Sequence, residues 1–376
     1  MSRKNISLQE MDVQQPVIQA VHTGPAAKPD KLMTLARLNP HPKDKNITFE
    51  EVSHTYTIHD PENGINNVLF SSVTTWNDCH FEKFDPDLAI RKMRNGRNWG
   101  PSNKYYGMSD AEIKKTWDNT KDVACSSGTN LHAAIEDFMN NQTLQYPYYH
   151  GHLYNEFFER YAREGAALLQ SNPTYTTKEW GFFLNYLKDL PGMKPYRTEW
   201  AVYHQKAKIA GMIDMLYENP DGTYIIADWK RTVQLDRNHK NERYPKFATT
   251  GCIKHFIDSN YWHYVLQLNI YRYILYHEYG KTVSRMFLII LHSNNKGGNY
   301  EMAEVPACDK EMHDLFNLRI SQLAAGLDVI AQHNQKDAMS KMVSAQKEAS
   351  RGLKPETATG DELLMKMMGS MSFTNK

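Results

Sequence analysis

The stretch that decides the fold is residues 208–230, KIAGMIDMLYENPDGTYIIADWK, which predicts two β-strands joined by a turn. The turn falls in Glu218–Gly222, where proline fixes one backbone angle and glycine supplies conformational freedom. Successive side chains of a strand point to opposite faces, so Asp228 and Lys230 share one face. An even pairing register places Asp214 on that face, opposite or diagonal to Asp228 and about 5–8 Å from it, whereas an odd register separates the two.

Two carboxylates and a lysine on one face form a candidate catalytic group. The oxygen ligands of Asp214 and Asp228 suit Mg²⁺ or Mn²⁺. A lysine beside the cation positions an attacking water molecule or stabilises the charge that develops on a phosphate. The three residues therefore predict metal-assisted hydrolysis, with Lys230 in a catalytic role. A D-x-K triplet alone is weak evidence, because most such triplets are ordinary strand ends.

The flanking sequence extends the hairpin into a larger core. Residues 198–204 predict a strand before it, and residues 261–279 predict a long helix closed by Gly280. Residues 283–292 form an apolar run typical of a buried strand, and residues 130–138 predict a helix before the sheet. The order helix, three strands, helix, strand predicts an α/β fold with helical N- and C-terminal additions.

Three polar residues on the predicted helices stand out from their surroundings. Gln267 lies in the largely apolar run 264–271, and a buried amide needs partners. Tyr271 comes four residues later, so both side chains project from one helix face. His132, on the earlier helix, is a candidate metal ligand or phosphate contact. Each is commonly structural when it occurs alone, but together with the hairpin, in this order, they favour a single active site.

Composition and periodicity divide the chain into five regions. The first, residues 1–45, is polar and proline-dotted, and we interpret it as a mobile N-terminal arm. The accessory region, 46–126, mixes strands and helices and includes a helix from a capping box at Ser109 to Trp117. The remaining regions are the predicted core, a helical region, and a short helix with a loose tail, at 127–300, 301–350 and 351–376.

Charge and composition exclude some classes of protein. The net charge is +1, so any basic surface must be local. Residues 91–97 and 230–246 are locally basic, although solvated loop charges are the commoner explanation of such stretches. The sequence has no apolar run long enough for a membrane span and no signal-peptide pattern. We therefore expect an intracellular protein that is not secreted and has no contact with a membrane.

Cysteine spacing argues against a zinc site. The four cysteines are far apart in the sequence, without the paired spacing of zinc ligands, at Cys79, Cys125, Cys252 and Cys308. Such scatter, without a secretory signal, is typical of reduced thiols.

Four motifs together resemble the RecB-like branch of the PD-(D/E)XK nucleases, to which the lambda-type exonucleases are related. In chain order they are Gly128-Thr-Asn-Leu-His132, Gly211-Met-Ile-Asp214, Asp228-Trp-Lys230 and Gln267-Leu-Asn-Ile-Tyr271. Their order, spacing and predicted elements all agree with the family. The resemblance covers about residues 127–292 and implies a restriction-endonuclease-like core.

The resemblance also implies a metal site. Asp214 and Asp228 would hold the metal with the backbone carbonyl of Trp229, and His132 would join them. Glu199, on the preceding strand, matches an additional acidic residue of some members. Several RecB-like nucleases carry a four-cysteine iron–sulfur cluster, but the cysteines here lack its clustered spacing, so we expect no cluster.

Further residues would act on the substrate. By the same resemblance, Lys230 would act on the water or the transition state, and Gln267 and Tyr271 would support the site or contact the DNA backbone. The basic segment that directly follows the D-x-K strand would border the substrate; its candidate contacts are Arg231, Arg237, Lys240 and Arg243.

The implied function is that of a Mg²⁺- or Mn²⁺-dependent DNA nuclease. We expect an exonuclease that acts on double- or single-stranded DNA in recombination, repair or replication. A protein partner from these processes and an oligomeric state are both compatible with the sequence. The motifs His54-x-Tyr56 and Ser72-Val-Thr resemble nuclease-like proteins of large DNA viruses or phages. Two alternatives remain: a catalytically inactive nucleic-acid-binding or structural protein on the same fold, and an RNA-directed nuclease.

Overall fold

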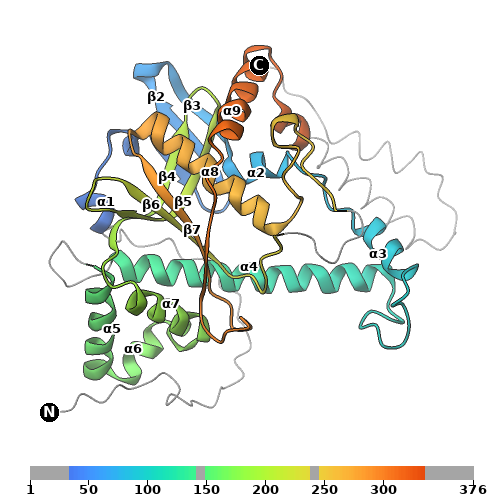
Figure 1. The fold of residues 1–376 in the computed structure, drawn as a ribbon, viewed down its shortest axis with the longest axis horizontal. Helices are drawn as coiled ribbons and strands as arrows, with labels where there is room; N and C mark the ends of the chain where they lie inside the picture. The colour runs from blue at the N-terminus through green and yellow to red at the C-terminus, as the bar shows by residue number, and fades with distance from the viewer. Residues whose placement is uncertain (1–33, 141–148, 238–244, 335–376) are drawn as a thin grey trace, which may run out of the picture. The chain divides into compact units, whose positions relative to one another are not determined.

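The computed structural model describes residues 34–140, 149–237 and 245–334 of the chain (Figure 1). The α-helices are α1 (Thr34–Leu38), α2 (Val73–Asp78), α3 (Pro86–Arg94), α4 (Asp110–Asn140), α5 (His150–Glu164), α6 (Ala166–Ser171), α7 (Lys178–Asp189), α8 (Asn260–Tyr279) and α9 (Asp309–Ala324). Short 3-10 helices are η2 (Pro42–Asn46), η3 (Pro61–Asn63), η4 (Pro173–Thr176) and η5 (Gly251–Ile253). The strands are β1 (Ile47–Glu50), β2 (Thr55–Asp60), β3 (Ile65–Ser72), β4 (Lys194–His204), β5 (Ile209–Glu218), β6 (Tyr224–Lys230), β7 (Val283–Ile290) and β8 (Glu301–Glu304).

A single mixed sheet forms the centre of the first compact unit, Met1–Ala325. Its strands follow the order β1-β2-β3-β5-β6-β7-β8, and β4 pairs with β5. The strands β4, β5 and β6 are joined antiparallel, whereas β6 and β7 are parallel, so α8 is the crossover between these two. The order α4, three strands, α8, β7 confirms the predicted α/β core. The second unit, Gly326–Lys376, is described only as far as residue 334.

The hairpin of β5 and β6 has the register on which the sequence argument depends. Met215 pairs with Ala227, and Glu218 pairs with Tyr224. Continuing this register by one residue sets Asp214 across from Asp228, so the even register is confirmed.

The strands β5 and β6 separate where the functional residues begin. Their ladder covers only 215–218 and 224–227, while β6 continues to pair with β7 as far as Lys230. At its other end the same edge of β5 pairs with β3, through Ile209 and Ala210. The edge of β5 from Gly211 to Asp214 therefore lies between two ladders, where its side chains can reach groups from several elements.

Helices α4 to α7 cover one face of the sheet, below it in Figure 1. Trp180 of α7 is fully buried there, and the rings of Phe138, Phe157, Tyr175 and Phe183 lie 4.5–5.7 Å from it. Trp229 of β6 points into the same core, with edge-to-face contacts of 5.6 and 5.7 Å to Tyr186 and Phe183. Since side chains alternate along a strand, this contact turns Asp228 and Lys230 away from the helical core.

Helix α8 lies across the opposite face of the sheet (Figure 1). Its Tyr279 ring packs edge-to-face on Trp200 of β4 at 5.2 Å, and its hydroxyl accepts from the Tyr203 amide. Asn269 is buried in the middle of the helix, where it bonds to the Val265 and Pro306 carbonyls and the Cys308 amide. These fixed contacts give the polar residues of α8 a defined position over the sheet.

Helix α4 differs from the prediction of two separate helices. The capping box forms, because Ser109 and Glu112 bond to each other's backbone and side chain. The helix that starts there does not end at Trp117 but runs without a break for 31 residues to Asn140. The residues between, including Gly128, belong to the same helix. The predicted region boundary at 126/127 thus falls inside α4 and stays a prediction.

The described end of the predicted N-terminal arm is packed on the core. Leu35 is buried, and its amide donates to Asn140 Oδ1 at 3.1 Å. Asp44 accepts from Arg197 at 2.9 Å and from the Trp200 indole at 2.8 Å. The rest of this arm, residues 1–33, lies outside the described residues, as do 335–350 and the predicted short helix and tail at 351–376. Among the described helices, none has the length and apolarity to cross a membrane.

Candidate active site

Three predicted residues from three elements meet at the fork between β5 and β6. His132 of α4 has its Nδ1 atom 3.6 Å from Glu199 Oε1 and 3.5 Å from Asp214 Oδ2. The ligand atoms of the three residues all lie within 4.8 Å of one another. Burial alone lowers the pKa of His132, but the carboxylates of Asp214 and Glu199 outweigh it and raise that pKa to about 9. The imidazole is thus held in a strongly negative environment.

Glu199 occupies a distorted place in β4. Its neighbours Thr198 and Trp200 pair with Met215 and Ile213, which sets Glu199 across from Asp214. Its φ angle is 42°, a left-handed conformation that costs a non-glycine residue energy and that clusters at functional sites. This backbone geometry accompanies a side chain brought to His132, so Glu199 takes a more central place than its sequence suggests.

Asp228 and Lys230 form an ion pair beside this group. Asp228 Oδ2 lies 2.7 Å from Lys230 Nζ, and the Asp228 side chain is almost completely buried. Burial, with the nearby charge of Asp214, raises the pKa of Asp228 to about 6. Burial alone would lower the pKa of Lys230, but Asp228 and Asp214 outweigh it and raise the pKa above its ordinary value. These carboxylates therefore favour the protonated, charged form of Lys230.

The backbone of Trp229 joins the two halves of the site. Its amide donates to Asp214 Oδ2 at 2.9 Å. Its carbonyl, a predicted metal ligand, lies 2.9 Å from His132 Nε2. These two contacts fix the orientation of Asp214 and His132 relative to the D-x-K strand.

Helix α8 supplies a hydrogen-bonded row behind Lys230. Lys230 Nζ donates to Gln267 Oε1 at 3.3 Å, and Gln267 Nε2 lies 3.5 Å from the Tyr271 hydroxyl. The Lys230 ammonium also lies 4.8 Å from the centre of the Tyr264 ring, which attracts a cation. Sequence reasoning missed Tyr264, although its spacing of three from Gln267 puts both on one helix face.

Gly211 allows α8 to approach β5 closely. A Cβ atom at this position would lie 2.7 Å from Val73 Cγ2 and 2.8 Å from Tyr271 Cε1. Both distances are shorter than real side chains tolerate, so only glycine fits without movement. This close approach explains why glycine stands three residues before Asp214.

The residues present suit a divalent cation. His132, Glu199 and Asp214 offer an imidazole nitrogen and two carboxylate groups within one small volume. Carboxylate oxygens suit Mg²⁺ and Mn²⁺, and imidazole is a ligand for several transition metals. The negative environment that raises the pKa of His132 also attracts a cation. Asp228, in contrast, is turned toward Lys230.

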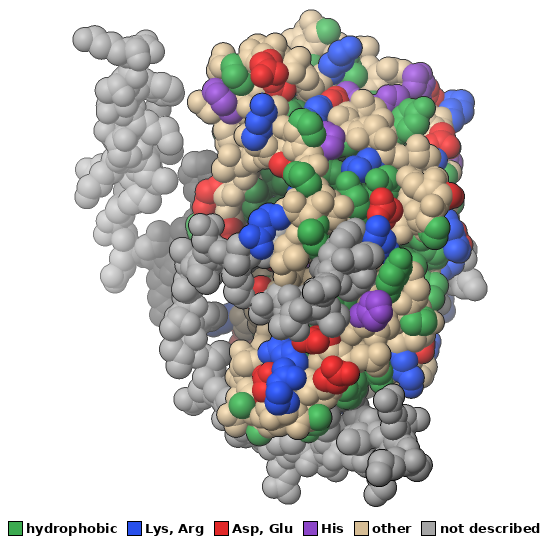
Figure 2. Space-filling view, turned by 90° about the vertical axis from the view of Figure 1, so that its left-hand side faces the viewer, with side chains coloured by type: hydrophobic (Ala, Val, Ile, Leu, Met, Phe, Trp, Pro, Cys, Tyr) green, Lys and Arg blue, Asp and Glu red, His purple; other side chains and the backbone are tan. Residues whose placement is uncertain are grey.

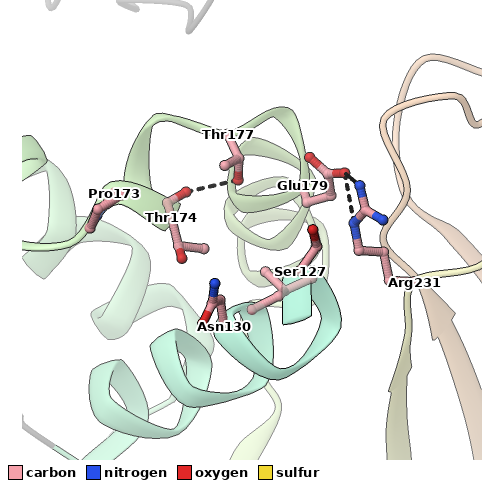
Figure 3. A pocket seen from close by; sticks show the side chains of 8 residues that line it. Ser127, Asn130, Pro173, Thr174, Thr177, Glu179 and Arg231 are labelled. Carbon is pink, nitrogen blue, oxygen red and sulfur yellow. Dashed lines mark hydrogen bonds and ion pairs between the residues drawn. The ribbon is translucent and has the colours of Figure 1, made fainter. Parts of the chain in front are cut away.

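A hollow of about 190 Å³ lies between α4, η4, the start of α7 and Arg231 (Figure 3). Asn130 and Ser127 of α4 face Thr174 of η4 across it, and Arg231 closes the far side. Leu131 and Arg231, which line it, are the chain neighbours of His132 and Lys230.

The predicted substrate contacts have different environments. Arg231 lies 3.1 Å from the buried Glu179, which neutralises part of its charge. Arg237 is exposed, and its guanidinium lies 4.9 Å from the centre of the Tyr261 ring. Lys240 and Arg243 lie outside the described residues.

The comparisons with known proteins identify the superfamily of this chain. The model of the PD-(D/E)XK nuclease superfamily matches residues 104–341, more than half of the chain. No curated protein matches. A solved structure titled "Crystal structure of SSO0001" is 13% identical, with a TM-score of 0.22 over 54% of this chain and 84% of its own. Members of this superfamily are generally nucleases that use divalent metals on nucleic acid, and this chain belongs to the PD-(D/E)XK nuclease superfamily.

Proposed function

We propose that this protein is a Mg²⁺-dependent DNA nuclease of the RecB-like branch, which acts as an exonuclease in recombination, repair or replication. The observation that carries the proposal is the meeting of His132, Glu199 and Asp214 beside the Asp228–Lys230 pair. All the residue types that metal-assisted phosphodiester hydrolysis needs are present at one fork of the sheet.

The carboxylates and the imidazole would bind the catalytic ion. We assign Glu199, Asp214 and His132 as ligands, and retain Asp228 and the Trp229 carbonyl in the same role because the family motif implies it. A Mg²⁺ or Mn²⁺ ion supplies Lewis-acid chemistry and promotes the ionisation of water near neutral pH. The Trp229 amide keeps Asp214 oriented for this task.

Lys230 would stabilise the negative charge of the reacting phosphate. Its ammonium is held between Asp228, Gln267 and the Tyr264 ring, so it needs little rearrangement when charge develops. Gln267 and Tyr271 are positioning residues in this proposal, because they act through Lys230.

DNA is the proposed substrate, with one strand passing the fork. The hollow lined by Asn130, Ser127 and Thr174 would take the nucleotide next to the cleaved bond. Arg231 and Arg237 would lie along the backbone, with Lys240 and Arg243 continuing the same segment.

Cleavage assays test both the activity and its mode. Purified protein with Mg²⁺ is given labelled linear duplex DNA, single-stranded DNA, closed circular DNA and RNA. An exonuclease digests linear DNA and leaves the circle intact. Asp214→Asn should abolish cleavage and Lys230→Met should slow it about 10²- to 10³-fold. Lys188→Gln, a charge change on the exposed end of α7, should leave cleavage unchanged. Undiminished cleavage by both site variants would refute the assignment. If the protein digests RNA alone, RNA and not DNA is its substrate.

A further inference from the structure

The basic segment near residue 91 lies in a part of the chain that the proposed reaction does not use. Residues 84–117, here called the arm, comprise α3, a turn-rich segment and the first turns of α4. The arm has its own small core, in which Ile90 and Ile113 are fully buried. Trp117 packs against Phe84 and donates its indole N–H to the Tyr105 hydroxyl at 2.8 Å. The arm is therefore an ordered part of the fold with its own packing.

The carboxylates of the arm form helix caps and ion pairs with other residues of the arm. Asp85 caps α3, and Glu112 caps α4. Asp87 pairs with Lys114 at 3.1 Å, and Asp110 pairs with Arg94 at 2.7 Å. The arm contains seven Lys and Arg against four Asp and Glu, so its remaining surface charge is positive. The exposed cations are Arg91, Lys92, Arg97, Lys104 and Lys115.

Helix geometry sets α3 on the same side of α4 as the active site. Lys114, which holds α3, and His132 are 18 residues apart, five turns of about 3.6 residues, so they share a helix face. Lys121 is about three turns from His132 and lies on this face too. Figure 1 agrees for α3, which lies on the same side of α4 as the sheet, whereas the turn-rich segment that follows α3 extends below the end of α4.

The middle of α4 acts as a spacer. Every residue from 118 to 126 is exposed, which is unusual for a helix inside a compact unit. At 1.5 Å per residue, Lys114 and His132 are about 27 Å apart along the axis. One strand of a DNA duplex places a phosphate every 3.4 Å or so, so this span matches about eight phosphates.

We propose that the arm is a second nucleic-acid contact, which binds the phosphate backbone of a duplex about eight nucleotides from the cleaved bond. This inference rests on the proposed function and adds to it the substrate class, a nucleic acid with a double-stranded region. Charge complementarity favours this occupant, because the arm has more cations than carboxylates and five of its cations are exposed. The opposite side of the molecule, in contrast, shows basic and acidic side chains interspersed (Figure 2).

Binding of duplexes of two lengths tests the inference. The variant Arg91→Gln, Lys92→Gln, Arg97→Gln is compared with Lys188→Gln, Lys254→Gln, Lys296→Gln, which removes the same charge from exposed positions elsewhere. Affinity for blunt duplexes of about 6 and about 16 base pairs is measured by fluorescence anisotropy from 50 to 200 mM salt, with EDTA to prevent cleavage.

The native protein and the control should bind the longer duplex more tightly than the shorter one. The arm variant should lose this preference and bind the longer duplex about tenfold more weakly, with a salt slope smaller by about 0.9 per lost contact. Equal melting temperatures establish that both triple variants fold. An arm variant that matches the control in salt dependence and in length preference overturns the inference. The arm cations would then be assigned to contact with a protein partner. Failure of the native protein to bind any duplex counts instead against the proposed function.

Discussion

Replacing Gly211 by alanine perturbs the active site without changing any reacting group. The added methyl would lie 2.8 Å from Tyr271 Cε1 and 2.9 Å from its hydroxyl, where ordinary contacts begin at 3.4 Å. Relief of this overlap requires movement of about 0.6 Å, and Tyr271 is buried, so its ring has little free space. The displacement passes to Gln267, which holds Lys230 at 3.3 Å.

The expected costs follow from these distances. Overpacking of a dense core destabilises a protein by about 1–3 kcal/mol. A misplacement of about 1 Å near the chemistry can cost about a hundredfold in rate. Because the displacement here is smaller and passes through two long hydrogen bonds, we expect about a tenfold lower kcat with little change in KM.

Denaturant unfolding and single-turnover cleavage by Gly211→Ala measure the two effects. The matched control is Gly192→Ala, since a Cβ there meets nothing within 4 Å. Adding Val73→Ala to Gly211→Ala removes the 2.7 Å contact and should recover part of the stability, but not the rate, because Tyr271 remains displaced. Wild-type stability and rate in the Gly211→Ala protein would refute the reasoning.

Three further predictions concern metal binding, charge and pH. Glu199→Gln should raise the Mg²⁺ concentration for half-maximal cleavage about tenfold or more, which a metal titration measures; an unchanged titration would remove Glu199 from the ligands. Lys230→Met should lower kcat about 10²- to 10³-fold in single-turnover assays, and a wild-type kcat would rule out charge stabilisation by this residue. Burial lowers the pKa of His150 to about 3 from an ordinary value of 6.5. Between these two pH values His150 is therefore protonated in the unfolded chain but neutral in the folded protein. The free energy of unfolding should therefore not depend on His150 above about pH 6.5, and should fall by up to about 1.4 kcal/mol per pH unit as the pH drops toward 3. Unfolding curves from pH 7 to 5 should be less pH-dependent in His150→Gln, and an identical dependence would contradict this reasoning.

The sequence by itself determined the elements that carry the site. The two-residue period of a strand predicted that Asp228 and Lys230 share a face. The turn at Glu218–Gly222 left Asp214 on that face only for an even register, which the sheet has. The four-residue spacing of Gln267 and Tyr271 likewise predicted one helix face, as the structure has it. These inferences succeed because periodicity and turn preferences are properties of neighbouring residues.

The tertiary structure decided how those residues divide their contacts. Glu199 reaches His132 only through the pairing of β4 with β5 and a left-handed backbone angle, neither of which has a local signature. Where β6 separates from β5, Asp214 contacts His132 and Asp228 pairs with Lys230, although the two acids look equivalent in the sequence. The length of α4 was also missed, since residues 118–126 are exposed and carry no apolar period that would mark a helix. In each case the deciding contacts join residues far apart in the chain, and only packing fixes their distances.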